Sequence, residues 1–468
     1  MSVMSAPTTT TTITPPAQRH HLALAIIVTC QLMLIIDATV MNVALPHIQA
    51  DLHLSTAGLT WVMTSYTLAF GGLLLLGGRA GDVFGRRRMF VGGIVLFTIA
   101  SLLGGLAPSA GWLLAARALQ GVGAAAAGPS TIALITTTFT ETRERIRALA
   151  LFSAASGAGF ALGLIVGGAV TEAASWRWVL FINVPFGIAA AALAPRFVAE
   201  PPRHAGRLDL PGALAATTGM LSLVYGLLSA TSHGWSSPVT IITIALGIVL
   251  IGCFISIEAR VRQPLMPLRL FGDRDRAAGY LGFALGPMAM MSTFFLLTQF
   301  VQDDRGYSPL RTGLAFLPLA LAMLTMSRVV PRILPRTGAR PLVMAGASMM
   351  TGGLIWLTQL HGGSAYATGI LGPMVLMGLG GGLAFIAMPP TIFATVPPQD
   401  AGAAGGVLQT MQQTGATLGI SVIAAVAAGT GGSLVAGMTN AFAVAAGIAA
   451  VIVVVVGPLF RSRVPAGS

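Results

Sequence analysis

Lysine is absent from this chain of 468 residues, so all 26 of its basic residues are arginines. Without lysine the chain can build neither a P-loop phosphate site nor a Schiff base with a carbonyl substrate. Cysteine is almost absent as well: Cys30 and Cys253 lie in separate apolar stretches and share no metal-ligand spacing. The seven histidines include no pair one helical turn apart. We therefore expect no metal site and no cofactor.

Charge is also scarce in this sequence. Only 9% of the residues are charged and 55% are hydrophobic, with a mean hydropathy of +0.83. Soluble domains carry about 25% charged residues, so this chain lacks the polar surface needed to face water, and we expect it to lie in lipid. The sequence also has no HExxH motif, no Gly-x-Ser-x-Gly motif and no paired acids within a span, which speaks against an intramembrane enzyme.

Long apolar runs make up most of the chain. A helix needs about 20 mostly apolar residues to cross a bilayer, whereas strands of a membrane barrel would alternate in polarity. A Thr- and Pro-rich leader, residues 1–21, is expected to be disordered in the cytoplasm. The sequence predicts an all-α polytopic membrane protein with fourteen spanning helices, at residues 22–44, 57–77, 89–107, 112–138, 148–171, 178–195, 211–230, 238–257, 277–301, 311–329, 341–360, 366–388, 401–428 and 435–459.

The placement of arginine predicts the orientation. With fourteen spans, 22 of the 26 arginines fall on one side of the membrane, whereas Arg177, Arg305 and Arg311 fall on the other. The positive-inside rule makes the crowded side cytoplasmic, which places both termini inside, at a bacterial cytoplasmic membrane. Twelve spans would preserve this separation and are the alternative. Because topology explains the basic surplus, nucleic acid is not expected as a partner.

Two parts of the chain resemble each other at a nearly constant offset. The segment Gly121–Gly123 recurs as Gly378–Gly380, and Gly85 before a run of arginines is echoed by Gly338 before Arg340. Repeated halves are typical of secondary transporters, whose substrate site lies where the repeats meet. We expect an N-terminal six-helix bundle at residues 22–198, an inserted helix pair at 199–262 and a C-terminal six-helix bundle at 263–468.

Several motifs stand in a fixed order along the chain. Residues 36–46 end the first helix as Ile-Asp-Ala-Thr-Val-Met-Asn-Val-Ala-Leu-Pro, and residues 117–123 read Arg-Ala-Leu-Gln-Gly-Val-Gly. Residues 176–185 form a third motif, at the start of the sixth helix. The loop after the second helix carries Gly78, Asp82, Gly85, Arg86, Arg87 and Arg88. The fifth helix carries Gly159, Gly163, Gly167 and Gly168.

This set of motifs resembles the major facilitator superfamily, in its fourteen-helix drug:proton antiporter branch. The resemblance implies a transporter of two six-helix bundles. It assigns residues 117–123 to proton transfer, the loop after the second helix to cytoplasmic gating, and the glycines of the fifth helix to close helix packing and antiport. The chain departs from the family pattern at Ala80, Val83 and Leu164, the last of which replaces a proline.

Asp37 and Arg117 are the lone acid and the lone base well inside the predicted spans. A charge at the bilayer centre costs roughly 3 kcal/mol on insertion scales, so such residues usually serve a function. At about 1.5 Å per helical residue, both lie at a similar depth from the same membrane face, and we predict that they approach each other. Their separation would then control the proton affinity of the carboxyl group. A static buried ion pair is the alternative.

Proton handling is expected in the first half alone, because the repeat offset places Ser292 and Met374 where the first half has Asp37 and Arg117. Met-rich surfaces repack around varied ligands. Helix packing, lipid contact or anchoring at the membrane interface is the simpler explanation for most such residues. The candidate substrate cavity is lined by Trp61, Tyr66, Met291, Phe295, Gln409 and Gln412.

Taken together, the sequence predicts proton-coupled efflux of drug-like or antibiotic organic amphiphiles by alternating access, carried out by a monomer. Because the chain has no nucleotide-binding motif, the proton gradient is the expected energy source. The alternatives are an uncoupled or symport facilitator of a metabolite and a membrane receptor without transport. The identity and charge of the substrate stay open at this point.

Overall fold

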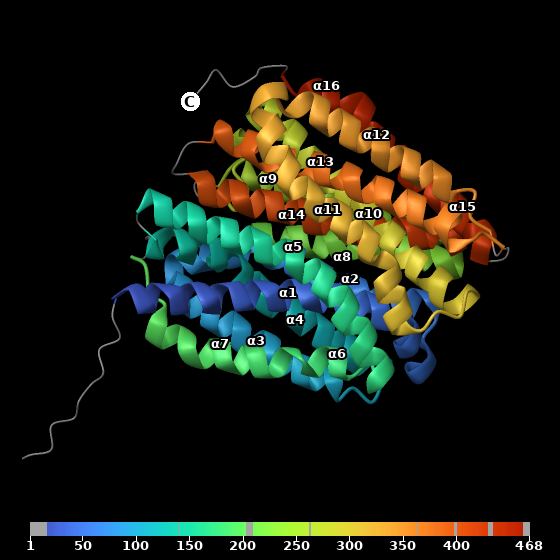
Figure 1. Ribbon diagram of the computed structural model, residues 1–468, viewed down its shortest axis with the longest axis horizontal. Helices are drawn as coiled ribbons and strands as arrows, with labels where there is room; N and C mark the ends of the chain where they lie inside the picture. The colour runs from blue at the N-terminus through green and yellow to red at the C-terminus, as the bar shows by residue number, and fades with distance from the viewer. Residues whose placement is uncertain are drawn as a thin grey trace, which may run out of the picture.

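The computed structural model describes residues 16–139, 141–202, 209–261, 264–361, 363–396, 400–428 and 434–461, and every regular element in these ranges is a helix. Figure 1 shows long helices running side by side along one direction. The all-α fold is thereby confirmed, and each of the fourteen segments expected from the sequence is helical.

Seven helices form what we call the N-terminal bundle, in which α4 packs against α2 and α3, and α1 packs against α5 and α7. The blue-to-green helices in the lower part of Figure 1 belong to it. The members are α1 (Pro16–Leu52), α2 (Thr56–Phe84), α3 (Arg86–Gly105), α4 (Ala110–Thr138), α5 (Thr142–Ala173), α6 (Trp178–Phe181) and α7 (Asn183–Phe197).

The C-terminal bundle, yellow to red in Figure 1, repeats this packing: α13 lies against α11 and α12, and α14 lies against α10. Three of its elements are π-helical turns. Its members are α10 (Arg274–Gln299), η2 (Phe300–Asp304), α11 (Pro309–Thr337), α12 (Ala339–Leu357), η3 (Tyr366–Leu371), α13 (Gly372–Ala394), α14 (Ala401–Ala428), α15 (Leu434–Val451), η5 (Ile452–Val456) and α16 (Gly457–Leu459).

Two further helices stand between the bundles in the sequence, α8 (Leu210–His233) and α9 (Pro238–Glu258), followed by the short 3-10 helix η1 (Leu268–Gly272). They pack against each other, and α8 also contacts both α2 and α14. The Thr217 hydroxyl on α8 donates a hydrogen bond to the Gly72 carbonyl on α2 (3.0 Å). The pair α8–α9 therefore lies along the seam between the two bundles.

Twelve of the described helical segments are long and apolar enough to cross a membrane. Two expected crossings are not among these twelve, namely α5 and α12. The first has 32 residues and packs between α1 and α11, and the second has 19 residues and packs on α13. Both therefore pack against helices that are among the twelve.

The repeat seen in the sequence reappears as equivalent helix crossings. A Cβ on Gly121 of α4 would collide with the Tyr66 carbonyl of α2, and a Cβ on Gly378 of α13 would collide with the Leu319 carbonyl of α11. Only a residue without a side chain lets two backbones approach this closely. The repeated glycines therefore hold the same pair of helices together in each bundle.

The helix ends of the two bundles are also equivalent. The hydroxyls of Ser55 and Ser308 cap α2 and α11 by accepting from backbone N–H groups three residues on. At the other end of the same helices stand Gly85 (φ 114°) and Gly338 (φ 75°), in a backbone region that favours glycine. We call the end that holds Gly85 the arginine-rich end and the other the opposite end.

The two bundles meet along α2 with α14 and along α5 with α11. At the middle of the seam the Thr417 hydroxyl donates to the Thr67 hydroxyl (2.7 Å). Toward the opposite end the Leu310 N–H donates to the Glu172 carboxylate (3.0 Å). The described part of the seam is therefore closed at its middle and at its opposite end.

Candidate functional site

Asp37 and Arg117 lie together inside the N-terminal bundle, as the depth argument predicted. The Arg117 Nη1 group donates to Asp37 Oδ2 at 2.6 Å, and both residues are 0% exposed. Asp37 comes from α1 and Arg117 from α4. The pair is thus an ion pair removed from solvent, in which each charge needs the other.

Two amide side chains complete the surroundings of the carboxylate. Gln120 Nε2 donates to Asp37 Oδ1 at 3.1 Å, and Asn183 Nδ2 donates to the same oxygen at 2.8 Å. Gln120 also accepts from Arg117 Nη1 (2.9 Å) and donates to the Ser101 hydroxyl (2.8 Å). Helices α1, α3, α4 and α7 therefore meet at one buried carboxylate.

The guanidinium of Arg117 is held on its other side by α2. Its Nε group donates to the Val62 carbonyl (3.3 Å), and its central carbon lies 4.5 Å from the centre of the buried Tyr66 ring. Its Nη2 group has no hydrogen-bond partner in the part of the chain that the structure describes. The face of the Tyr66 ring supplies a cation–π contact to the same guanidinium. We call Asp37, Tyr66, Ser101, Arg117, Gln120 and Asn183 the charge network.

The charge network can exchange a proton only by rearranging. All three donors to Asp37 are N–H groups, and a carboxylate can only accept hydrogen bonds, so this arrangement suits the ionised acid. A proton on Asp37 would cancel its attraction for Arg117, and the guanidinium would then remain buried without its counterion. A proton on Asp37 would therefore require a rearrangement of the network.

The sequence singled out Asp37 and Arg117 but not the neutral members of the network. Gln120 and Asn183 stood within recognised motifs, and Tyr66 was assigned to the substrate cavity. Their positions carried one usable signal: Gln120 lies three residues after Arg117, on the same face of α4. Ser101 on α3 carried none that we can identify.

The gating-motif residues lie at the arginine-rich end of α2 and α3. Asp82 accepts a hydrogen bond from Arg86 four residues on, and Arg88 is exposed. Gly78 faces α4, where a Cβ would stand 3.5 Å from the Pro129 side chain. The positive φ of Gly85 would strain any residue with a side chain. These residues therefore shape the turn between α2 and α3.

Arg87 connects this turn to the end of α7. Its backbone N–H donates to Glu200 Oε1 (3.0 Å), and its Nη1 group donates to the carbonyls of Pro195 and Val198 (3.2 Å each). A Cβ on Gly85 would stand 2.8 Å from the same Glu200 oxygen. Glu200 is a partner of the gating motif that the sequence interpretation missed, because it follows the motif by more than 100 residues.

The glycines of α5 line two helix contacts. Three of them face α1. A Cβ on Gly159 would stand 3.0 Å from Leu32, and a Cβ on Gly167 would stand 2.8 Å from Val40. A Cβ on Gly163 would collide with Thr39. Gly168 faces α11 instead, where a Cβ would stand 2.6 Å from the Pro309 carbonyl. Leu164, which replaces the family's proline, lies within an unbroken helix.

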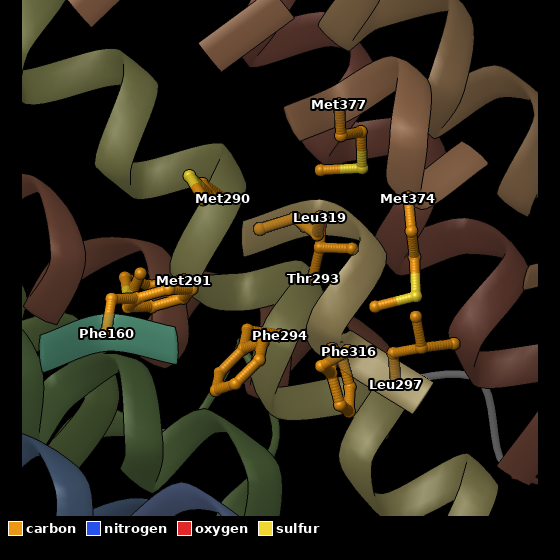
Figure 2. Close-up of a pocket in the computed structure, with 10 residues that line it drawn as sticks. All are labelled: Phe160, Met290, Met291, Thr293, Phe294, Leu297, Phe316, Leu319, Met374 and Met377. Carbon is orange, nitrogen blue, oxygen red and sulfur yellow. The ribbon is translucent and has the colours of Figure 1, made fainter. Parts of the chain in front are cut away.

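A small cavity lies on the C-terminal side of the seam, and Figure 2 shows the side chains around it. It has room for the centre of about one water molecule, about 10 Å³. Helices α10, α11 and α13 supply nine of its lining residues and α5 supplies one. The lining is Phe160, Met290, Met291, Thr293, Phe294, Leu297, Phe316, Leu319, Met374 and Met377.

Of the residues expected at a substrate cavity, Met291 lines this one. Phe295, four residues after Met291 on α10, is buried in the core and does not line the cavity. Trp61 packs instead against Tyr225 of α8, with ring centres 6.5 Å apart. The remaining members also lie elsewhere: Tyr66 belongs to the charge network, and Gln409 and Gln412 are half-buried on α14.

Comparisons with known proteins give a consistent picture. The family model described as Major Facilitator Superfamily matches residues 27–420. The puromycin resistance protein pur8 of Streptomyces alboniger is 42% identical over 411 residues, covering 87% of this chain and 81% of that protein. The cephamycin export protein CmcT of Amycolatopsis lactamdurans is 43% identical over 417 residues, covering 88% and 86%. The lincomycin resistance protein of Streptomyces lincolnensis is 34% identical over 402 residues, covering 85% and 82%.

Among solved structures, the nucleoside transporter NupG has a TM-score of 0.65 with 13% sequence identity, covering 94% of this chain and 100% of that one. At this identity the likeness concerns the fold alone.

Proposed function

Because this chain belongs to the Major Facilitator Superfamily of membrane transporters, we propose that it exports drug-like or antibiotic organic amphiphiles across the cytoplasmic membrane in exchange for protons. Three bacterial relatives, whose alignments cover more than four fifths of this chain, are named as antibiotic resistance or export proteins. Their names support export as the direction of transport. The proton as the exchanged ion is inferred from the charge network.

The observation that carries the proposal is the buried pair of Asp37 and Arg117. A buried carboxyl group whose cation partner can move away changes its proton affinity when the protein changes conformation. In the state described here the carboxyl group of Asp37 is paired with Arg117 and accepts from three N–H groups. A proton that reaches Asp37 would release Arg117 and favour the alternative state. Transport of substrate and movement of the proton are then linked through one residue.

The contacts between the bundles indicate what must open. At the opposite end, Gln302 of η2 donates to the Val43 carbonyl of α1 (2.9 Å), and Glu172 of α5 accepts from the Leu310 N–H of α11. Both bonds join the N-terminal bundle to the C-terminal bundle. They would have to break for that end to admit protons and release substrate, as alternating access requires.

The arrangement of arginines supports an orientation with the arginine-rich end in the cytoplasm and both termini there. In this orientation Asp82, Arg86 and Arg87 lie at the cytoplasmic surface. The bonds of Arg87 to Glu200 and to the end of α7 would keep the turn between α2 and α3 in place while the bundles rock. The gating role of this turn follows from the family resemblance.

Transport into inverted membrane vesicles tests the proposal directly. Wild-type protein should accumulate a fluorescent aromatic dye when the vesicle interior is acidified, and an uncoupler should abolish the accumulation. Asp37→Asn should abolish it as well, whereas Asp37→Glu, which keeps the carboxyl group, should retain part of it. Dye transport by Asp37→Asn at the wild-type rate would contradict the proposal.

A stability control is needed because Asp37→Asn leaves Arg117 buried without a counterion. Removing one partner of a buried ion pair typically costs about 3–5 kcal/mol. The double variant Asp37→Asn with Arg117→Gln removes both charges and should recover much of that stability while remaining inactive. An uncoupled facilitator, the main alternative, would instead equilibrate the dye in every folded variant and would be insensitive to the uncoupler.

A further inference from the structure

The cavity in the C-terminal bundle stands where the N-terminal bundle has its charge network. The offset of 257 residues that relates Gly121 to Gly378 also relates Arg117 to Met374 and Gln120 to Met377. Met374 and Met377 both line the cavity. Two equivalent positions of the repeated fold therefore hold an arginine and a glutamine in the N-terminal bundle and two methionines in the C-terminal bundle.

The neighbouring helix gives the same correspondence. The offset of 253 residues that relates Ser55 to Ser308 relates Tyr66 to Leu319. Tyr66 lies under the guanidinium in the N-terminal bundle, and Leu319 lines the cavity in the C-terminal bundle. The helix crossings at Gly121 and Gly378 place these two residues equivalently, since their carbonyls face the two glycines.

The cavity wall offers no free side-chain hydrogen-bond donor among its lining residues. Thr293 is the one lining residue with a polar side chain, and its hydroxyl donates to the Ala289 carbonyl of its own helix (2.8 Å). Ser292, which the repeat sets against Asp37, likewise donates to the Met288 carbonyl. Polar groups bonded within their own helix do not recognise a ligand strongly. The wall therefore recognises shape and apolar surface.

Three aromatic rings form one side of this wall. The ring centres of Phe294 and Phe316 are 4.5 Å apart, and those of Phe160 and Phe294 are 5.9 Å apart. Figure 2 shows Phe160 arriving on a separate helix from one side of the cavity, with Met374 and Met377 across from it. Because Phe160 belongs to α5, the cavity spans the seam between the bundles and would change shape as they rock.

The interior also offers no spare counterion to a cationic substrate. Asp37, the lone acid well inside the described spans, is held by Arg117, Gln120 and Asn183. Its charge is cancelled by that of Arg117, so the charge network is neutral as a whole. A permanent cation moved into an apolar wall without a counterion loses its hydration with little compensation.

We propose that this cavity binds an uncharged aromatic part of the substrate and that the transporter selects against permanent cations. The proposal rests on the export function proposed above and specifies its substrate class. The four methionines, Met290, Met291, Met374 and Met377, have flexible unbranched side chains that can move to admit a ring. Such movement is required, because the cavity as described holds about one water molecule.

A matched pair of compounds tests this selectivity. 4-Phenylpyridine is uncharged at mildly alkaline pH, and N-methyl-4-phenylpyridinium differs from it by one methyl group and a permanent positive charge. Binding of each radiolabelled compound to the purified transporter in lipid nanodiscs is measured against empty nanodiscs. We expect the uncharged compound to bind at least about tenfold more tightly, because an unpaired charge is disfavoured in an apolar site.

A charge placed in the wall should reverse the preference. Met291→Glu supplies a carboxylate next to Phe160 and Phe294, and we expect it to favour the cation by about tenfold, since an opposite charge stabilises a buried cation. Met291→Gln has nearly the same shape without the charge and should keep the wild-type order. A gain of cation binding in Met291→Glu requires a folded protein, so a misfolded variant cannot mimic it.

The outcomes separate this proposal from the export function. Equal or tighter binding of the cation by wild-type protein, or saturable binding of neither compound, overturns the proposed selectivity even if uncoupler-sensitive transport is observed. A preference for the uncharged compound that Met291→Glu reverses supports it, even if the dye experiment on Asp37→Asn contradicts proton coupling.

Discussion

At the residue scale, the two charged members of the charge network, Asp37 and Arg117, differ in how completely they are hydrogen-bonded. Asp37 receives three N–H donors, one from Arg117, one from Gln120 and one from Asn183. Arg117 in turn donates to Asp37, Gln120 and the Val62 carbonyl, and the two N–H bonds of its Nη2 group have no hydrogen-bond partner in the described structure. Both oxygens of the acid are therefore hydrogen-bonded, whereas one amino group of the base is not.

Asn183→Ala should shift the pH dependence of dye transport. The substitution removes one donor to the ionised carboxylate, so a proton competes against one hydrogen bond fewer. The half-maximal pH of transport should move to a higher value, with the maximal rate less affected. Asn42→Ala is the matched control, because Asn42 is also a buried asparagine of this bundle but makes no hydrogen bond to Asp37 in the described structure. Equal shifts in both variants would count against a role for Asn183 at the carboxylate.

The charged members of this site could be predicted from the sequence and the neutral ones could not. Asp37 and Arg117 stand out because charge in a span is costly and therefore rare, and counting residues gave their similar depth. A glutamine or asparagine in a span costs much less, so its presence alone says little. Whether Asn183 reaches Asp37 depends on the rotation of α7 about its axis, which a hydropathy pattern does not fix.

At the element scale, single glycines decide how closely helices approach. Gly92 and Gly93 are neighbours on α3 with opposite surroundings. A Cβ on Gly93 would stand 2.6 Å from the Gly123 carbonyl of α4, whereas a Cβ on Gly92 would meet nothing within 4 Å. The adjacent positions therefore form a natural comparison of a packed and an open glycine.

Gly93→Ala should lower the thermal stability of the purified transporter, by about 1–3 kcal/mol, because the added methyl group forces α3 and α4 apart. Gly92→Ala should leave stability unchanged or raise it by up to about 1 kcal/mol, because alanine restricts the unfolded chain more than glycine does. Thermal unfolding followed by circular dichroism in detergent measures both. A loss of stability in Gly92→Ala equal to that in Gly93→Ala would show that the crossing with α4 is not the cause.

Helices could be located from the sequence more easily than their contacts. All fourteen segments are helical, because apolar runs of this length have few other solutions in lipid. The ends were less predictable: α1 continues to Leu52, eight residues past the predicted end at residue 44, since polar residues can extend a helix into water. The contact between α14 and α10 could have been found from the repeat. Gly415 and Gly419 on α14 stand 256 residues after Gly159 and Gly163, which pack α5 against α1.

At the scale of the whole molecule, the two bundles build two different sites on one scaffold. The same helix crossings surround a charged site in the N-terminal bundle and an apolar cavity in the C-terminal bundle. With the roles proposed above, the proton and the substrate need not compete for one residue. The two sites would instead be coupled through α5. Its residue Phe160 lines the cavity, and its residue Gly159 packs against α1, the helix that carries Asp37.

This separation has a consequence for the driving force. If an uncharged substrate leaves in exchange for one proton, each cycle carries one positive charge into the cell. The membrane potential then contributes about 2.3 kcal/mol per 100 mV in addition to the pH gradient. Exchange of a monovalent cation for one proton would move no net charge and would be insensitive to the potential.

Inverted vesicles with equal pH on both sides allow this to be measured. A potassium diffusion potential that makes the interior positive should by itself drive accumulation of the uncharged fluorophore N-phenyl-1-naphthylamine, because protons are then driven out through Asp37. The opposite polarity should not, and Asp37→Asn should accumulate none under either polarity. If a pH gradient drives accumulation but the potential does not, the exchange is electroneutral. Because this fluorophore is uncharged, a second ion must then balance the charge of the proton, and the exchange of an uncharged substrate for one proton is wrong.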